Sequence, residues 1–140
     1  IKNRKIAPRT WTTEPTKTCQ IEDLILTVRA PVGTIATSRH KACIGRGVAA
    51  ITHNKMASQH FLYQFLLGYE SKWVRLEQGS TFTAVSGSDI KGISIVYPYL
   101  AEQIKIANFL STLDTKIEQV SQQITQTQTF KKGLLQQMFV

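Results

Sequence analysis

The sequence predicts an α+β fold, in which a small domain with a mixed β-sheet precedes a long C-terminal α-helix that pairs as a coiled coil. Between Asp23 and Thr52, short apolar, β-rich runs alternate with turns, as in a meander of strands. From Ala101 to the last residue there is no proline and one glycine, and apolar residues recur at helical spacing. We therefore divide the chain into a domain at residues 1–98 and a helix at residues 99–140.

Each element of the domain follows from a local pattern. Apolar runs bounded by turn residues predict strands at residues 23–28, 34–37, 42–44, 48–52 and 93–96. Ser58 is predicted to cap a helix that ends near Leu76, and the aromatic face of this helix is predicted to pack in the core. Residues 86–89 are predicted to cap a short turn before the last strand.

The C-terminal helix carries an apolar seam of the kind that joins two helices. Its residues recur at steps of four and three, the a and d pattern of a coiled coil: Ile106, Leu110, Leu113, Ile117, Val120 and Ile124. Thr127 and Lys131 interrupt the seam, and Leu134 and Met138 restore it. We expect the residues from Leu110 on to pair with a second helix, from this chain or another. The alternative is a long amphipathic helix that closes a globular domain.

Positive charge is concentrated in the first part of the chain. Residues 1–55 hold ten Lys and Arg against three Asp and Glu, whereas residues 56–140 hold seven against six. The formal net charge of the whole chain is +8. A basic excess gathered in one region indicates a polyanion as partner, most often nucleic acid. The alternative left open by charge alone is a basic surface that only keeps the protein in solution.

Candidate DNA-binding residues lie in the turns and polar loops. They are Arg9, Trp11, Arg29, Arg39, Lys41, Arg46, Thr81 and Thr83. Basic side chains contact phosphates, while Arg, Ser and Thr also read base edges. Trp11 either stacks on the nucleic acid or is buried against the sheet. Arg46 lies between two glycines and is either a groove contact or a solvated turn residue, and the loop of Thr81 and Thr83 is either a contact or a plain connector.

The sequence shows no constellation that predicts catalysis, a metal or a cofactor. It lacks a glycine-rich S-adenosylmethionine loop and the tetrad of DNA amino-methyltransferases, and Asp89-x-Lys91 has no upstream carboxylate suited to a nuclease site. Cys19 and Cys43 are expected to be reduced thiols, and the three histidines have no ligand-like partners. No apolar run has the length of a membrane span, so we expect a cytoplasmic protein without a membrane partner.

An ordered series of motifs resembles the specificity subunit of type I restriction–modification enzymes. The series is Asp23–Gly33 (DLILTVRAPVG), Ile44–Ala49 (IGRGVA), Gly79-Ser80-Thr81 with Ser88-Asp89-Ile90, Pro98-x-Leu100-x-Glu102-Gln103-x-x-Ile106-Ala107, and Leu113-Asp114. Each motif alone is modest, but together they run in order over most of the chain, from about Cys19 to Val140.

The resemblance implies a DNA-recognition subunit without catalysis of its own. In this family two recognition domains each read half of a split site on double-stranded DNA, and two spacer helices pair antiparallel between them. Methyltransferase subunits dock on this scaffold, and restriction subunits join through them. Set against this family pattern, we expect these residues to comprise one domain, without its opening segment, and one helix. The second helix would then belong to a missing half or to another copy. The alternatives are the recognition fragment of a larger DNA methyltransferase and a coiled-coil homodimerisation module.

Overall fold

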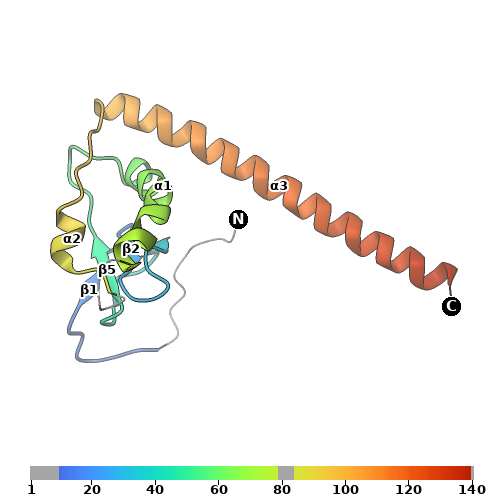
Figure 1. The fold of residues 1–140 in the computed structure, drawn as a ribbon, viewed down its shortest axis with the longest axis horizontal. Coiled ribbons are helices and arrows are strands. Elements are labelled where there is room, and N and C mark those ends of the chain that lie inside the picture. Colours follow the sequence, from blue (N-terminus) through green and yellow to red (C-terminus); the bar gives the residue numbers. More distant parts are fainter. Residues whose placement is uncertain (1–9, 79–83, 140) are drawn as a thin grey trace. The chain divides into compact units, whose positions relative to one another are not determined.

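The computed structural model describes residues 10–78 and 84–139 (Figure 1). Within these ranges the chain forms small β-sheets first and helices afterwards. The strands are β1 (Thr18–Cys19), β2 (Leu24–Thr27), β3 (Ile35–Thr37), β4 (Ala42–Cys43) and β5 (Val48–Ile51). The helices are α1 (Gln59–Gln78), α2 (Gly87–Lys91) and α3 (Leu100–Met138). The predicted α+β class, with a long C-terminal helix, is therefore confirmed.

The strands form two small antiparallel sheets. The larger has the order β3-β2-β5, with β2 in the centre, and the smaller pairs β1 with β4. Every pairing among the described residues is antiparallel, so the prediction of a mixed sheet is wrong in this respect. For β2 and β3 the physical reason is the short connection between Thr27 and Ile35, because a parallel pair needs a crossover of a dozen or more residues and antiparallel strands need only a turn.

The turn between β2 and β3 is held together by the hydroxyl group of Thr27. This hydroxyl donates to the Pro31 carbonyl at 2.6 Å and accepts from the Thr34 backbone N–H at 2.9 Å. The N–H of Gly33 also donates to the Thr27 carbonyl at 3.0 Å. Gly33 has a φ of 90°, in the left-handed region that a residue with a Cβ rarely adopts. The turn therefore depends on a glycine at this position.

Helix α1 packs on the three-stranded sheet and closes the core. Leu24, Leu26 and Ile35 from the sheet are fully buried, as is Trp73 on the helix, and Leu66 is nearly so. Full burial of an aliphatic side chain contributes about 1.5–3 kcal/mol. The ring of Tyr69 lies edge-on to Trp73 with centroids 5.2 Å apart. The prediction that the aromatic face of this helix packs in the core is confirmed.

Residues 93–96 do not form the predicted strand. Ile93 and Ile95 are partly buried against the core, while Ser94 and Val96 are exposed, so the alternating burial of a strand is present. No strand pairs with this segment in the part of the chain that the structure describes. Apolar alternation specifies which side chains face the core, but a strand also needs a neighbour that supplies backbone hydrogen bonds.

Helix α3 is one uninterrupted helix of 39 residues, about 58 Å long at about 1.5 Å per residue (Figure 1). The compact unit of the domain extends to Ala107, and the helix from Asn108 on is a unit of its own. Its threonines donate their hydroxyl groups to carbonyls four residues earlier, at 2.8–3.0 Å, from Thr112, Thr115, Thr125, Thr127 and Thr129. These bonds satisfy polar groups that otherwise compete with helix formation.

Gly33 should tolerate no side chain. A Cβ on Gly33 would lie 2.7 Å from Trp73 Cγ, so Gly33→Ala meets both a steric overlap and an unfavourable φ. We expect Gly33→Ala to lower the free energy of unfolding by about 1–3 kcal/mol, measured by urea denaturation with tryptophan fluorescence. Gly45→Ala is the matched control, because its Cβ would meet open space. Equal stability of the two variants would contradict the packing of Trp73 on this turn.

Candidate nucleic-acid interface

The predicted basic residues lie at two opposite ends of the three-stranded sheet. Strands β2 and β3 are antiparallel, with Leu24 opposite Thr37 and Leu26 opposite Ile35. The loop after β2, which carries Arg29, and the turn after β3, which carries Arg39 and Lys41, are therefore at different ends. All three side chains are exposed. The structure thus separates residues that the sequence treats as one basic group.

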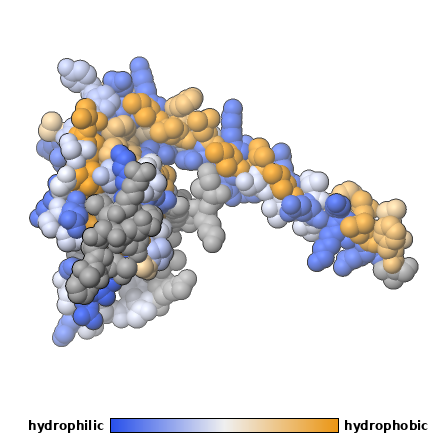
Figure 2. Space-filling model, viewed as in Figure 1, coloured by the Kyte–Doolittle hydropathy of each residue, from blue (hydrophilic) through white to orange (hydrophobic). Residues whose placement is uncertain are grey.

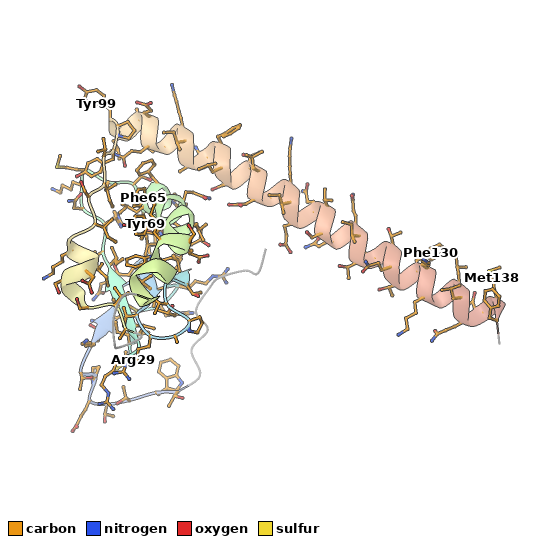
Figure 3. All side chains as sticks on the ribbon, viewed as in Figure 1. Arg29, Phe65, Tyr69, Tyr99, Phe130 and Met138 are labelled. Carbon is orange, nitrogen blue, oxygen red and sulfur yellow. The ribbon has the colours of Figure 1, made fainter. Side chains whose placement is uncertain are left out.

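One end of the sheet gathers Arg29 and Arg46. The N–H of Val28 donates to the Gly47 carbonyl at 2.9 Å, which ties the end of β2 to the turn that holds Arg46. Arg29 also forms an isolated antiparallel bridge with Ala84, so the segment that follows residues 79–83 reaches the same end. Figure 3 shows Arg29 at the end of the domain away from Tyr99, the residue before α3.

A cleft of about 490 Å³ opens beside Arg46. Lys17 and Arg46 are the basic residues that line it, and apolar side chains including Val28, Val48 and Ile90 form much of its wall. Lys17 reaches this place because its carbonyl accepts a hydrogen bond of 2.8 Å from the Ile44 N–H, next to the β1–β4 pair. Sequence reasoning did not single out Lys17, because the two-residue strand β1 that follows it was not predicted.

The opposite end of the sheet is held by a small polar cluster below Arg39 and Lys41. Ser38 is buried, and its hydroxyl donates to the His40 carbonyl at 2.6 Å. The Ser38 N–H donates to the Asp23 carbonyl at 2.9 Å. These bonds order the turn while Arg39 and Lys41 extend into solvent.

Four candidate residues remain to be placed, of which three lie outside the described part of the chain. Arg9, Thr81 and Thr83 are not among the described residues. Trp11 is described and is 89% exposed, so the alternative that it is buried against the sheet is wrong. An exposed indole on a basic segment is available for stacking on a base or a sugar.

The two cysteines lie on the paired strands β1 and β4 but on different faces. Cys19 is opposite Ala42 and Cys43 is opposite Thr18, so the two residues are not partners in the ladder. Cys19 is buried, with its sulfur 3.3 Å from the Ser38 hydroxyl, whereas Cys43 is exposed. Both are free thiols, as expected from the sequence.

Asp89 serves the fold as a helix cap. Its carboxylate accepts hydrogen bonds from the Ser86 N–H at 2.8 Å and from the Ser86 hydroxyl at 2.7 Å, and that hydroxyl in turn accepts from the Asp89 N–H. This capping box starts the short helix α2, where the sequence predicted a capped short turn. The described residues hold no group of three or more His, Cys, Asp and Glu placed to bind a metal ion. Nor does any helix in residues 10–78 and 84–139 combine the length and apolar character of a membrane span.

The seam of α3 is exposed along most of its length. Leu113, Ile117, Val120, Ile124 and Leu134 are 40–53% exposed, Met138 is 72% exposed, and Leu110 is partly buried. Figure 2 shows apolar surface along the helix, with a further apolar group at its C-terminal end. That group includes Phe130, Leu135 and Phe139, which the seam pattern did not contain; Phe130 and Met138 stand out from the helix in Figure 3.

The start of α3 is attached to the domain through a buried amide. Gln103 has no exposed surface, and its Oε1 accepts from the Ser58 N–H at 2.8 Å. Its Nε2 donates to the carbonyls of Met56 at 3.0 Å and of Pro98 at 2.9 Å. Gln103 precedes Ile106 by three residues and so occupies a seam position. A polar glutamine at an otherwise apolar seam position was the signal in the sequence that could have identified this contact. The seam pattern alone does not identify the groups to which the glutamine binds.

The fold combines a small α+β domain with a long C-terminal helix. The chain belongs to the type I restriction modification DNA specificity domain family, whose model matches residues 4–127. It is 36% identical over 129 residues to a putative type I restriction enzyme MjaX specificity subunit of Methanocaldococcus jannaschii, covering 91% of this chain and 30% of that protein. The MjaIX specificity subunit of the same organism is 33% identical over 102 residues, or 71% of this chain and 24% of the relative.

Solved structures agree with this assignment. A chain from a study of complex assembly and conformational transition of the type I R-M system matches with a TM-score of 0.86 and 27% identity, over 94% of this chain and 33% of that one. The HsdS subunit from Thermoanaerobacter tengcongensis matches with a TM-score of 0.75 and 26% identity, over 84% of this chain and 28% of that one. The chain thus spans about a third or less of the length of these relatives.

The capping box predicts the titration of Asp89. Hydrogen bonds from the Ser86 side chain and backbone stabilise the carboxylate and lower the pKa of Asp89. These hydrogen bonds contribute fully to the stability of the folded state at a pH above about 3.9, the ordinary pKa of an aspartate. Their contribution is lost as the pH falls through the lowered pKa of Asp89. NMR titration should show that Ser86→Ala raises the pKa of Asp89. An unchanged pKa in this variant would show that Ser86 is not the cause.

Proposed function

We propose that this chain recognises double-stranded DNA as part of the specificity subunit of a type I restriction–modification system. In this role it directs methyltransferase subunits, and through them restriction subunits, to the target site, and it catalyses no step itself. The observation that carries the proposal is membership of the DNA specificity domain family over residues 4–127. The exposed basic loops of the domain support the proposal, because phosphate contacts supply much of the affinity of DNA-binding proteins.

We place the DNA at the end of the sheet that carries Arg29 and Arg46. Lys17 lines the cleft beside Arg46, and Arg29 bridges to Ala84, which directly follows Thr83 in the sequence. This end therefore combines basic side chains for phosphates with an arginine between two glycines that is free to approach a groove. Arg9 and Trp11 precede this region in the chain. Arg39 and Lys41, at the other end, are the less favoured contacts.

We propose that α3 pairs antiparallel with a second spacer helix, supplied by a second copy of this chain when no second half is present. A two-fold axis at Gln122 places Val120 opposite Ile124 and Leu110 opposite Leu134. In the same register Ile106 meets Met138, while Thr127 and Lys131 lie opposite Ile117 and Leu113. This arrangement matches a to d positions throughout, as antiparallel pairing requires, and it covers a stripe that soluble monomers rarely expose.

The first test compares the two ends of the sheet. We expect Arg29→Ala/Arg46→Ala to flatten the dependence of log K on log salt by about 1.8, because two lost phosphate contacts count about 0.9 each. Arg39→Ala/Lys41→Ala removes the same charge from the other end and should change the slope less. The measurement is fluorescence anisotropy with duplex DNA over a salt series. A larger effect of the Arg39/Lys41 pair would place the DNA at the opposite end.

The second test concerns the helix. Ile117→Lys/Ile124→Lys buries two charges from each chain in the proposed pair and should convert a dimer into a monomer in sedimentation velocity, while Trp73 remains buried. Gln119→Lys/Gln126→Lys adds the same charges seven residues apart at exposed positions off the seam and should leave the dimer intact. A wild-type chain that is monomeric at tens of micromolar would overturn self-pairing and assign the seam to the other half of a longer subunit.

A further inference from the structure

Gln103 is linked to three separate segments of the domain. Its Oε1 binds the N–H of Ser58, directly before α1, and its Nε2 binds the carbonyls of Met56 and Pro98. Both Nε2 hydrogens and the oxygen are thus used, in a side chain without exposed surface. One amide therefore joins the chain before α1, the chain before α3, and α3 itself.

The geometry of this contact is more specific than packing alone requires. An apolar residue could fill the same space, but it would leave the Ser58 N–H and the carbonyls of Met56 and Pro98 without these partners. Hydrogen bonds have narrow ranges of distance and angle, whereas apolar contacts allow sliding. Ala107, one turn further along α3, is also buried, and its small side chain lets the helix lie close to the domain. The first turns of α3, through Ala107, are therefore held in one orientation against the rest of the domain.

We propose that Gln103 is a positioning residue that sets the distance between the two DNA half-sites read by a pair of recognition domains. This inference rests on the proposed function. Helix α3 continues from Gln103 without a proline, and Gly133 is its only glycine, so a change at its start is carried along it. Over the roughly 28 Å from Gln103 to Gln122, a tilt of α3 by about 10° at Gln103 moves the proposed two-fold axis by about 5 Å relative to the domain, against a rise of about 3.4 Å per base pair.

The test uses the full chain and duplexes with a half-site selected from random DNA. The half-site is present either once, or twice in inverted orientation with a separation that increases by one base pair at a time. Gln103→Met removes all three hydrogen bonds at similar volume. Gln103→Glu keeps the acceptor for Ser58 and removes both donors. Gln119→Met is the matched control, because Gln119 is an exposed glutamine on the same helix. Circular dichroism confirms that each variant is folded.

We expect the wild-type chain and Gln119→Met to prefer one separation by at least tenfold over its neighbours. Gln103→Met and Gln103→Glu should bind a single half-site within about twofold of the wild type but spread their preference over several separations. An unchanged spacing profile, or loss of folding in both variants, would make Gln103 a stability residue and overturn the proposal. A wild-type chain that binds DNA without a preferred separation would overturn it too. Failure of the wild-type chain to bind any duplex would instead refute the proposed function.

Discussion

The bare backbone at Gly33 allows the indole of Trp73 to lie directly on the turn between β2 and β3, and the rest of the domain depends on this contact. It fixes α1 on the small sheet, where Leu24, Leu26 and Ile35 are fully buried. At the N-terminal end of α1, the N–H of Ser58 in turn donates a hydrogen bond to the Oε1 of Gln103. Packing of one aromatic ring thus connects the strand loops, α1 and the first turns of α3.

Helix α3 uses two kinds of surface for two purposes. Its first turns are buried through Gln103 and Ala107, whereas its seam beyond Asn108 remains exposed. A hydrogen-bonded amide specifies one geometry, and an apolar stripe supplies adhesion without fixing register as strictly. The helix therefore has a specific attachment to its own domain and a more permissive surface, which we propose is covered by a second helix.

The distribution of charge illustrates how function is placed on this fold. The strands provide a core with few residues, and the loops at their ends carry the arginines and lysines. Recognition residues commonly lie on loops that a rigid scaffold positions. Because antiparallel strands send alternate loops to opposite ends, only part of the basic excess reaches any one end, and a net charge cannot show which part.

The sequence by itself determined the fold class, the extent of α3, the strands β2 to β5, α1 with its aromatic core face, and a cap at residues 86–89. These features depend on neighbours in the chain, namely helical or strand periodicity and capping chemistry. Only the tertiary structure decided that the sheets are antiparallel, that residues 93–96 have no ladder partner, that Arg29 and Arg46 are separated from Arg39 and Lys41, and that Gln103 joins α3 to the domain. Each of these features depends on a partner that is distant in the sequence. A local pattern indicates whether a side chain is apolar, polar or charged, but it does not identify the residue that this side chain contacts.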